Sequence, residues 1–148
     1  MSLSVQSDRT QTLTGQEGAL RVFLENLDAA RAVTVRTLAH AWIAAGQTVQ
    51  VGRMTVRLIA TDKQGFPFTA GTLHPGRLEL ARVLLQSHGI SEPTWRAWCD
   101  ERPELASRGF DARANFPAIQ LDGASEVTVA RLALGLRDLA LAVRDQRA

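Results

Sequence analysis

Several common features are missing from this sequence. It contains one cysteine, Cys99, no tyrosine, and one lysine, Lys63, among 17 basic residues. A single cysteine excludes an internal disulfide framework and fits a reducing compartment. No stretch approaches the roughly 18 consecutive apolar residues of a membrane-spanning helix, and the N-terminus has no apolar signal core. These absences predict a soluble, cytoplasmic protein without a membrane partner.

Positive charge is present but dispersed. The pI is about 9.5, whereas the formal net charge is only +2. The arginines are spread along the chain, and with the heavy use of alanine, leucine and valine they indicate a bacterial-like genome composition rather than recognition chemistry. Association with nucleic acid is an alternative that predicts binding weakened steeply by salt. Its candidate residues are Arg53, Arg57, Arg77, Arg108 and Arg113.

Length and composition predict one folded domain. The chain has 148 residues, of which 45% are hydrophobic and 22% charged, so it can bury a core without disulfides or metals. Residues 1–15 are rich in serine, threonine and glutamine, with Val5 and Leu13 as the main apolar side chains. We therefore expect a flexible N-terminal tail over residues 1–15 and the domain over residues 16–148.

Residues 16–46 have helical periodicity. Apolar side chains recur three and four residues apart in two stripes: Leu20, Phe23, Leu24 and Leu27, then Val35, Leu38, Trp42 and Ala45. Residues 26–28 predict a joint between two helices, because Asn26 and Asp28 compete for backbone hydrogen bonds. One unbroken helix is the alternative. Gly46 is expected to end the second helix.

From Thr48 the apolar pattern alternates with a period of two, which predicts an antiparallel meander of three to five strands. Gly52 and Arg53 suit a two-residue hairpin turn, with Met54 beginning the next strand. In the strand after the turn at 61–65, Pro67 cannot donate a hydrogen bond, so it should lie at a sheet edge or at an irregular start.

Residues 77–85 suit either a strand or a helix, and we expect a short strand that runs into a helix ending at His88. Ser91 should cap a helix that carries Trp95 and Trp98. A polar loop at 108–114 and a strand at 116–121 follow, and Ser125 begins a long helix over 125–146. The predicted fold class is α+β, with two N-terminal helices, a small antiparallel sheet, and a long C-terminal helix packed on the sheet.

Motifs for catalysis or cofactor binding are incomplete. Residues 71–76 have the two glycines of a phosphate-binding loop, but Arg77 and Leu78 stand where that loop needs lysine and a hydroxyl residue. No metal-ligand spacing connects the histidines, His40, His74 and His88. We therefore predict no cofactor and no metal. An enzyme whose site is assembled from distant residues around His74 or Cys99 is an alternative.

Residues 108–113 are the most suggestive polar stretch. Arg108 and Arg113 flank Phe110, so the loop offers two cations for phosphates and one ring for stacking on a base. In the simpler interpretation Phe110 turns inward as an anchor and the arginines stay in solvent. The candidate ligand or nucleic-acid residues are His74, Arg77, Arg108, Phe110 and Arg113.

The helix at 125–146 has apolar residues on two faces. One seam is expected to face the domain: Val129, Leu132, Leu136, Leu139 and Val143. At about 100° per residue, Val127, Ala130, Leu134 and Leu141 fall on nearly the opposite side. Leu134 and Leu141 are aligned, which suits packing against a second subunit.

The sequence therefore predicts a non-catalytic interaction module that self-associates or binds a protein partner. The interface candidates for a homodimer through the C-terminal helix are Val127, Leu134 and Leu141. Burial of these side chains beneath the protein's own N-terminal helices is the alternative.

Overall fold

A computed structural model describes the backbone of residues 5–145 and the side chains of residues 15–145. Its helices are α1 (Val5–Glu25), α2 (Ala29–Ala44), α3 (Arg82–Ser87), α4 (Glu92–Asp100), the 3₁₀ helix η1 (Pro103–Arg108) and α5 (Glu126–Asp145). Its strands are β1 (Thr48–Val51), β2 (Val56–Thr61), β3 (Pro67–His74), β4 (Arg77–Leu80) and β5 (Ala118–Gln120). Apart from η1, this is the predicted order of elements.

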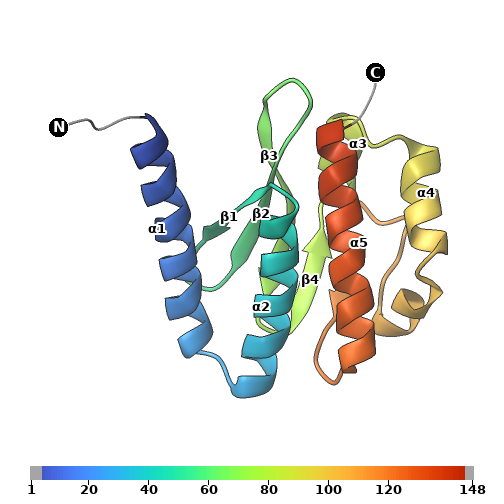
Figure 1. Ribbon diagram of the computed structural model, residues 1–148. Helices are drawn as coiled ribbons and strands as arrows, with labels where there is room; N and C mark the ends of the chain where they lie inside the picture. The colour runs from blue at the N-terminus through green and yellow to red at the C-terminus, as the bar shows by residue number, and fades with distance from the viewer. Residues whose placement is uncertain (1–4, 146–148) are drawn as a thin grey trace.

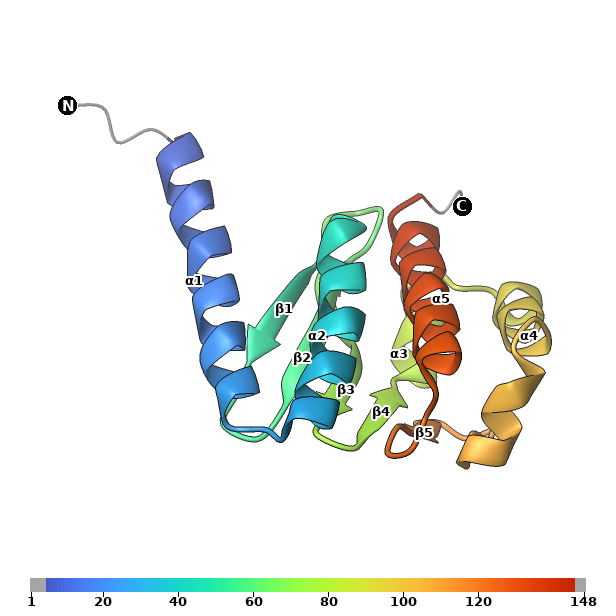
Figure 2. The same ribbon diagram turned by 60° about the horizontal axis from the view of Figure 1, so that its bottom comes forward.

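The strands form one antiparallel sheet in the order β1-β2-β3-β4-β5, so each strand pairs with its neighbour in the sequence. α1, α2 and α5 lie side by side across one face of this sheet, and α4 flanks α5 (Figures 1 and 2). The predicted α+β class, with two N-terminal helices and a long C-terminal helix on the sheet, is confirmed. Among the described residues, no helix combines the length and the apolar character needed to cross a membrane.

The joint between the first two helices lies where the sequence predicts it, and the alternative of one unbroken helix is wrong. α1 ends at Glu25 and α2 begins at Ala29. Asp28 caps α2, because its carboxylate accepts a hydrogen bond from the backbone N–H of Arg31 at 2.9 Å. After α2, Gly46 has a φ of 94°, a backbone conformation that favours glycine.

The N-terminal helix is longer than predicted. Residues 5–15, assigned to a flexible tail, belong to α1, and residues 1–4 lie outside the described part of the chain. A helix already nucleated by packed residues extends at little cost, because each further residue adds a hydrogen bond. Leu20, Phe23 and Leu24 supply that packed part, since each is at most 8% exposed. The flexibility expected of residues 1–15 stays a prediction.

The β1–β2 connection differs from the predicted two-residue turn. Val51 pairs with Val56, so residues 52–55 form the loop, and Met54 lies in it with its side chain 67% exposed. Gly52 does not have the positive φ that a two-residue hairpin turn requires of its first residue. The observed register places Val56 and Leu58, both fully buried, opposite Val51 and Val49.

Pro67 is the first residue of β3, which is a central strand. The prediction of a position at the start of a strand is therefore confirmed, and an edge strand is wrong. Leu73 and His74 still belong to β3, so only Pro75 and Gly76 connect it to β4. Residues 77–85 contain both a strand and the start of a helix, as expected.

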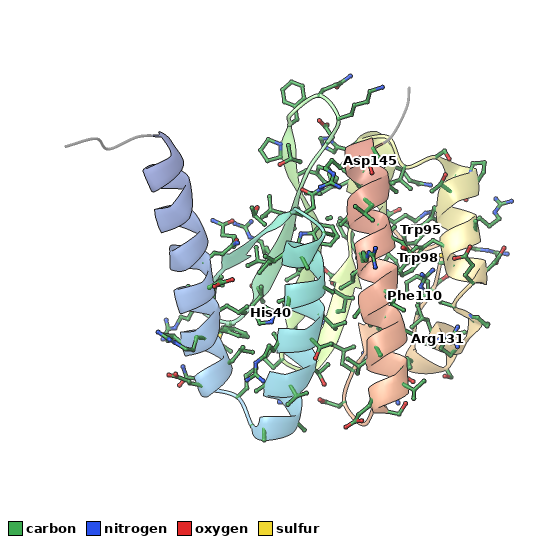
Figure 3. All side chains as sticks on the ribbon, in the orientation of Figure 1. His40, Trp95, Trp98, Phe110, Arg131 and Asp145 are labelled. Atoms are coloured by element: carbon green, nitrogen blue, oxygen red, sulfur yellow. The ribbon has the colours of Figure 1, made fainter. Side chains whose placement is uncertain are left out.

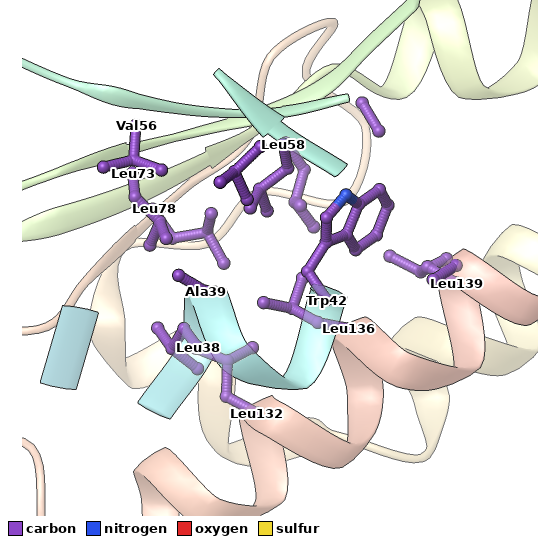
Figure 4. Close-up of a cluster of buried hydrophobic side chains, with 14 of the residues drawn as sticks. Leu38, Ala39, Trp42, Val56, Leu58, Leu73, Leu78, Leu132, Leu136 and Leu139 are labelled. Atoms are coloured by element: carbon purple, nitrogen blue, oxygen red, sulfur yellow. The ribbon is translucent and has the colours of Figure 1, made fainter. Parts of the chain in front are cut away.

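The core lies between the sheet and the helices α2 and α5 (Figure 4). The predicted seam of α5 is buried, with no member more than 7% exposed: Val129, Leu132, Leu136, Leu139 and Val143. It meets α2 and the sheet through side chains that are at most 1% exposed: Leu38, Ala39, Trp42, Val56, Leu58, Leu73 and Leu78. Gln47, 5% exposed, accepts from the N–H of Thr61 and donates to the carbonyl of Ala140. This amide ties β2 to α5 inside the core.

A second packed layer lies between α4 and α5. Trp98 donates its indole N–H to the carbonyl of Gly135 at 2.8 Å. The guanidinium of Arg102, whose side chain is 8% exposed, stacks over the Trp98 ring and donates to Asp138 at 3.0 Å. Gly135 leaves the space that Arg102 and Trp98 occupy. Trp95 and Trp98 belong to the core, because they are 1% and 5% exposed.

Candidate interaction surface

The helices α2 and α5 run side by side in the same direction (Figure 1). At their N-terminal ends, the guanidinium of Arg31 binds the carboxylate of Asp122 at 2.8 Å, just before α5. At their C-terminal ends, Arg144 donates to the carbonyl of Ala45 at 3.1 Å. The two contacts hold the helices together at both ends and leave a shallow valley between them.

We call the side of this helix pair that is turned away from the sheet the outer helical face. Its members on α2 are small or uncharged: Ala30, Val33, Thr34, Thr37, Ala41 and Ala44. Its members on α5 include larger apolar side chains: Val127, Ala130, Leu134 and Leu141. Val33, Val127 and Leu134 are 54%, 69% and 56% exposed. The face therefore presents apolar area to solvent over two adjacent helices.

A groove of about 600 Å³ lies between the N-terminal halves of α2 and α5. Its walls include Val33, Thr34 and Thr37 from α2 and Val129 and Ala130 from α5, and most of its surface is apolar. A smaller hollow of about 350 Å³ lies at the C-terminal ends of the pair, lined by Ala44, Ala45, Gly46, Arg137, Leu141 and Arg144. The outer helical face thus combines protruding side chains with hollows.

The predicted interface residues do not share one environment. Val127 and Leu134 are more than half exposed, so burial beneath the protein's own N-terminal helices is wrong for both. Leu141 is half-buried at the edge of the core and lines the smaller hollow with Ala44 and Ala45. One member of the predicted set is therefore half-buried beside the end of α2, and the other two are mostly exposed.

Two opposite charges border the groove and the hollow. Glu126 lies in the first turn of α5 and lines the groove, and Arg137 lies three turns later and lines the smaller hollow. Within the described residues, neither side chain forms a hydrogen bond or an ion pair with its own chain. Asp122 differs, because its hydrogen bond from Arg31 lowers the pKa of the carboxyl group.

The polar loop does not present the arrangement that a nucleic-acid site would need. Arg108 donates to the carbonyls of Asp122 and Gly123 at 2.9 and 3.1 Å, so it fastens the β5–α5 turn. Phe110 packs beside Trp95 and Trp98 between α4 and α5, as the simpler interpretation predicts (Figure 3). Arg113 is exposed.

His74 and Arg77 lie on the sheet face opposite the helices. They are paired across β3 and β4, and the register places Arg57, Thr72 and Glu79 on the same face. Burial, together with the charge of Arg77, lowers the pKa of His74, whereas Glu79 opposes that effect. The sheet thus brings Arg57 of β2 onto the same face as His74 and Arg77, but Glu79 shares their surface.

The cysteine and the remaining histidines have local structural roles or surface positions. Burial raises the pKa of the Cys99 thiol to about 11, which favours the unreactive neutral form. Nδ1 of His88 lies 2.8 Å from the carboxylate of Asp62, and the His88 ring stacks on Phe68, so the pair joins the β2–β3 turn to the end of α3. His40 is exposed beside α1. Over the described chain, no group of three or more His, Cys, Asp or Glu side chains is arranged to hold a metal ion.

Sequence reasoning missed the contribution of α2 to this surface. The core stripe of α2 was recognised, but the uncharged opposite side with Val33 was not. A signal was present, because six positions of α2 with helical spacing carry no charge: Ala30, Val33, Thr34, Thr37, Ala41 and Ala44. Comparison with known proteins adds no functional assignment, since no family model, curated protein or solved structure matches this chain.

Proposed function

We propose that this protein is a non-catalytic interaction module that forms a homodimer through its outer helical face. The observation that carries the proposal is the exposure of Val33, Val127 and Leu134 on one face, beside an apolar groove. Large apolar side chains gathered at a groove are typical of surfaces that bind another protein.

The exposed apolar side chains account for part of the expected affinity. Full burial of a valine or leucine side chain contributes about 1.5–3 kcal/mol, and these three are already partly covered, with 54%, 69% and 56% of Val33, Val127 and Leu134 exposed. Six such side chains in a symmetric dimer would contribute roughly 6 kcal/mol on that scale. Association also costs translational and rotational freedom, so the rest of the face must contribute as well. Dimerisation at tens of micromolar corresponds to a net binding free energy of roughly −6 kcal/mol, so these further contacts must offset the cost of association.

A competing surface lies between α1 and the β1–β2 loop. Val22 and Met54, 56% and 67% exposed, line a groove of about 490 Å³ there together with Arg53. This groove is smaller than the one between α2 and α5. Val22 and Leu134 are equally exposed, so they form a matched pair of positions for comparing the two surfaces.

Sedimentation velocity tests the proposal over a range of protein concentrations. The parent protein should be a dimer at tens of micromolar, Leu134→Glu should be monomeric, and Val22→Glu should remain dimeric. Circular dichroism should show that both variants keep the parent's helical content, because both positions are exposed. A parent that is monomeric at about 100 µM would overturn the proposal, and a different protein would become the expected partner. Dissociation of the dimer by Val22→Glu but not by Leu134→Glu would also overturn it.

A further inference from the structure

Two charged residues beside the outer helical face indicate how a second copy would bind to it. Glu126 and Arg137 are 11 residues apart in α5. At about 100° and 1.5 Å per residue, they point within about 20° of each other and lie about 16 Å apart along the helix. Neither is neutralised within the described part of its own chain. Glu126 at the start of α5 and Arg137 near its middle could therefore pair across an interface, whereas the exposed residues Arg131, Asp138 and Arg144 already form ion pairs within the chain.

We infer that the two α5 helices of the homodimer cross in antiparallel orientation, with Glu126 of each copy facing Arg137 of the other. This inference rests on the proposed dimer and specifies its geometry. With a two-fold axis midway between the two residues, the dimer contains two equivalent ion pairs. In a parallel pair, Glu126 would face Glu126 and Arg137 would face Arg137, and both like-charge contacts are unfavourable.

The shape of the face supports the same orientation. With the axis midway between Glu126 and Arg137, Leu134 of one copy lies beside Ala130 of the other. Ala130 lines the apolar groove together with the small side chains Thr34 and Thr37 of α2. A large side chain that is 56% exposed in the single chain thus meets a hollow of matching polarity. The same surface supplies both the protrusion and the groove, as a two-fold interface requires.

The antiparallel arrangement also places the helix ends favourably. The partly positive N-terminus of each α5 comes close to the middle of the other, whereas a parallel pair would bring like ends together. This contribution is small and screened by salt. The charge pair and the leucine–alanine contact are therefore the features to test.

Charge reversal provides the test, with sedimentation equilibrium as the measurement. Glu126→Arg and Arg137→Glu should each weaken the homodimer roughly tenfold at low salt, because each turns two attractive pairs into repulsive ones. An equimolar mixture of the two single variants should form a heterodimer of near-parental affinity, since every pair is then attractive. The double variant, Glu126→Arg with Arg137→Glu, should also recover the parental affinity. Thermal unfolding followed by circular dichroism checks that each variant folds.

The outcomes separate this inference from the proposed function. A parent dimer that is lost in Leu134→Glu but unaffected by either charge reversal would overturn the antiparallel arrangement and leave the proposed function standing. Weakening by both single variants without recovery in the mixture and the double variant would also overturn it. A monomeric parent would remove both. The result in favour is weakening by each single change with recovery in both combinations.

Discussion

Replacing Gly135 with alanine tests the packing of α4 against α5. An alanine Cβ at this position would overlap Nε of Arg102 and lie 3.0 Å from Cζ2 of Trp98. Arg102 cannot move away freely, because it donates to the carbonyl of Trp98 at 2.9 Å and to Asp138 at 3.0 Å. The substitution therefore forces either a strained contact or the loss of a buried charged hydrogen bond.

Two opposing effects set the expected change in the free energy of unfolding. Alanine in place of glycine inside a helix stabilises by about 1 kcal/mol. Overpacking costs about 1–3 kcal/mol, and losing a hydrogen bond to a charged group costs about 1.5–3 kcal/mol. With a combined cost of about 3 kcal/mol, Gly135→Ala should lower the free energy of unfolding by about 2 kcal/mol.

Urea unfolding followed by circular dichroism measures this effect, and Gly18→Ala is its control. Gly18 lies within α1, and a Cβ there would meet no atom within 4 Å. Gly18→Ala should therefore raise the free energy of unfolding by about 0.5–1 kcal/mol. In an Arg102→Ala background, most of the penalty of Gly135→Ala should disappear, because the main obstructing side chain is gone. If Gly135→Ala is as stable as the parent or more so, the tight packing described for Arg102 is wrong.

Two further predictions concern titratable groups. The hydrogen bond with His88, followed by the one from the N–H of Phe66, lowers the pKa of Asp62 below its usual 3.8. A lowered carboxyl pKa contributes its full stabilisation only above the unfolded-state pKa. The parent should therefore be more stable than Asp62→Asn by a constant amount above about pH 4–5, and this difference should shrink as the pH falls further. Urea unfolding at several pH values measures the difference, and a difference that does not change with pH would contradict the prediction. The neutral Cys99 thiol, with its pKa raised to about 11, should react with iodoacetamide at pH 8 roughly 100-fold more slowly in the folded than in the urea-unfolded protein. Equal rates would show that Cys99 is accessible and ionises normally.

Local patterns in the sequence determined most of the secondary structure. The spacing of Val129, Leu132 and Leu136 identified the buried side of α5, because a helix turns the same side chains toward the sheet every three or four residues. Ser91 and Ser125 marked helix starts, and each accepts a hydrogen bond from the backbone N–H three residues later. The β1–β2 loop was misplaced because its length depends on strand register, which two turn residues do not specify.

Only the tertiary structure decided which faces of the helices are covered by other parts of the chain. Leu134 and Leu141 share one side of α5 in the sequence pattern, yet Leu134 is 56% exposed whereas Leu141 is half-buried beside the end of α2. Arg108, a candidate for phosphate binding by residue type, donates instead to the backbone of the β5–α5 turn.

Contacts between distant parts of the chain produce these differences. Arg31 meets Asp122 across 91 positions, and Arg144 meets Ala45 across 99. Periodicity reports which side of a helix is apolar, since that depends only on residues a few positions apart. It cannot report what lies against that side, because the neighbour comes from another part of the chain and is set by how the helices pack on the sheet. The sequence therefore determined the two-faced C-terminal helix, and the packing of α2 beside α5 decided that the second face borders a groove and stays largely exposed.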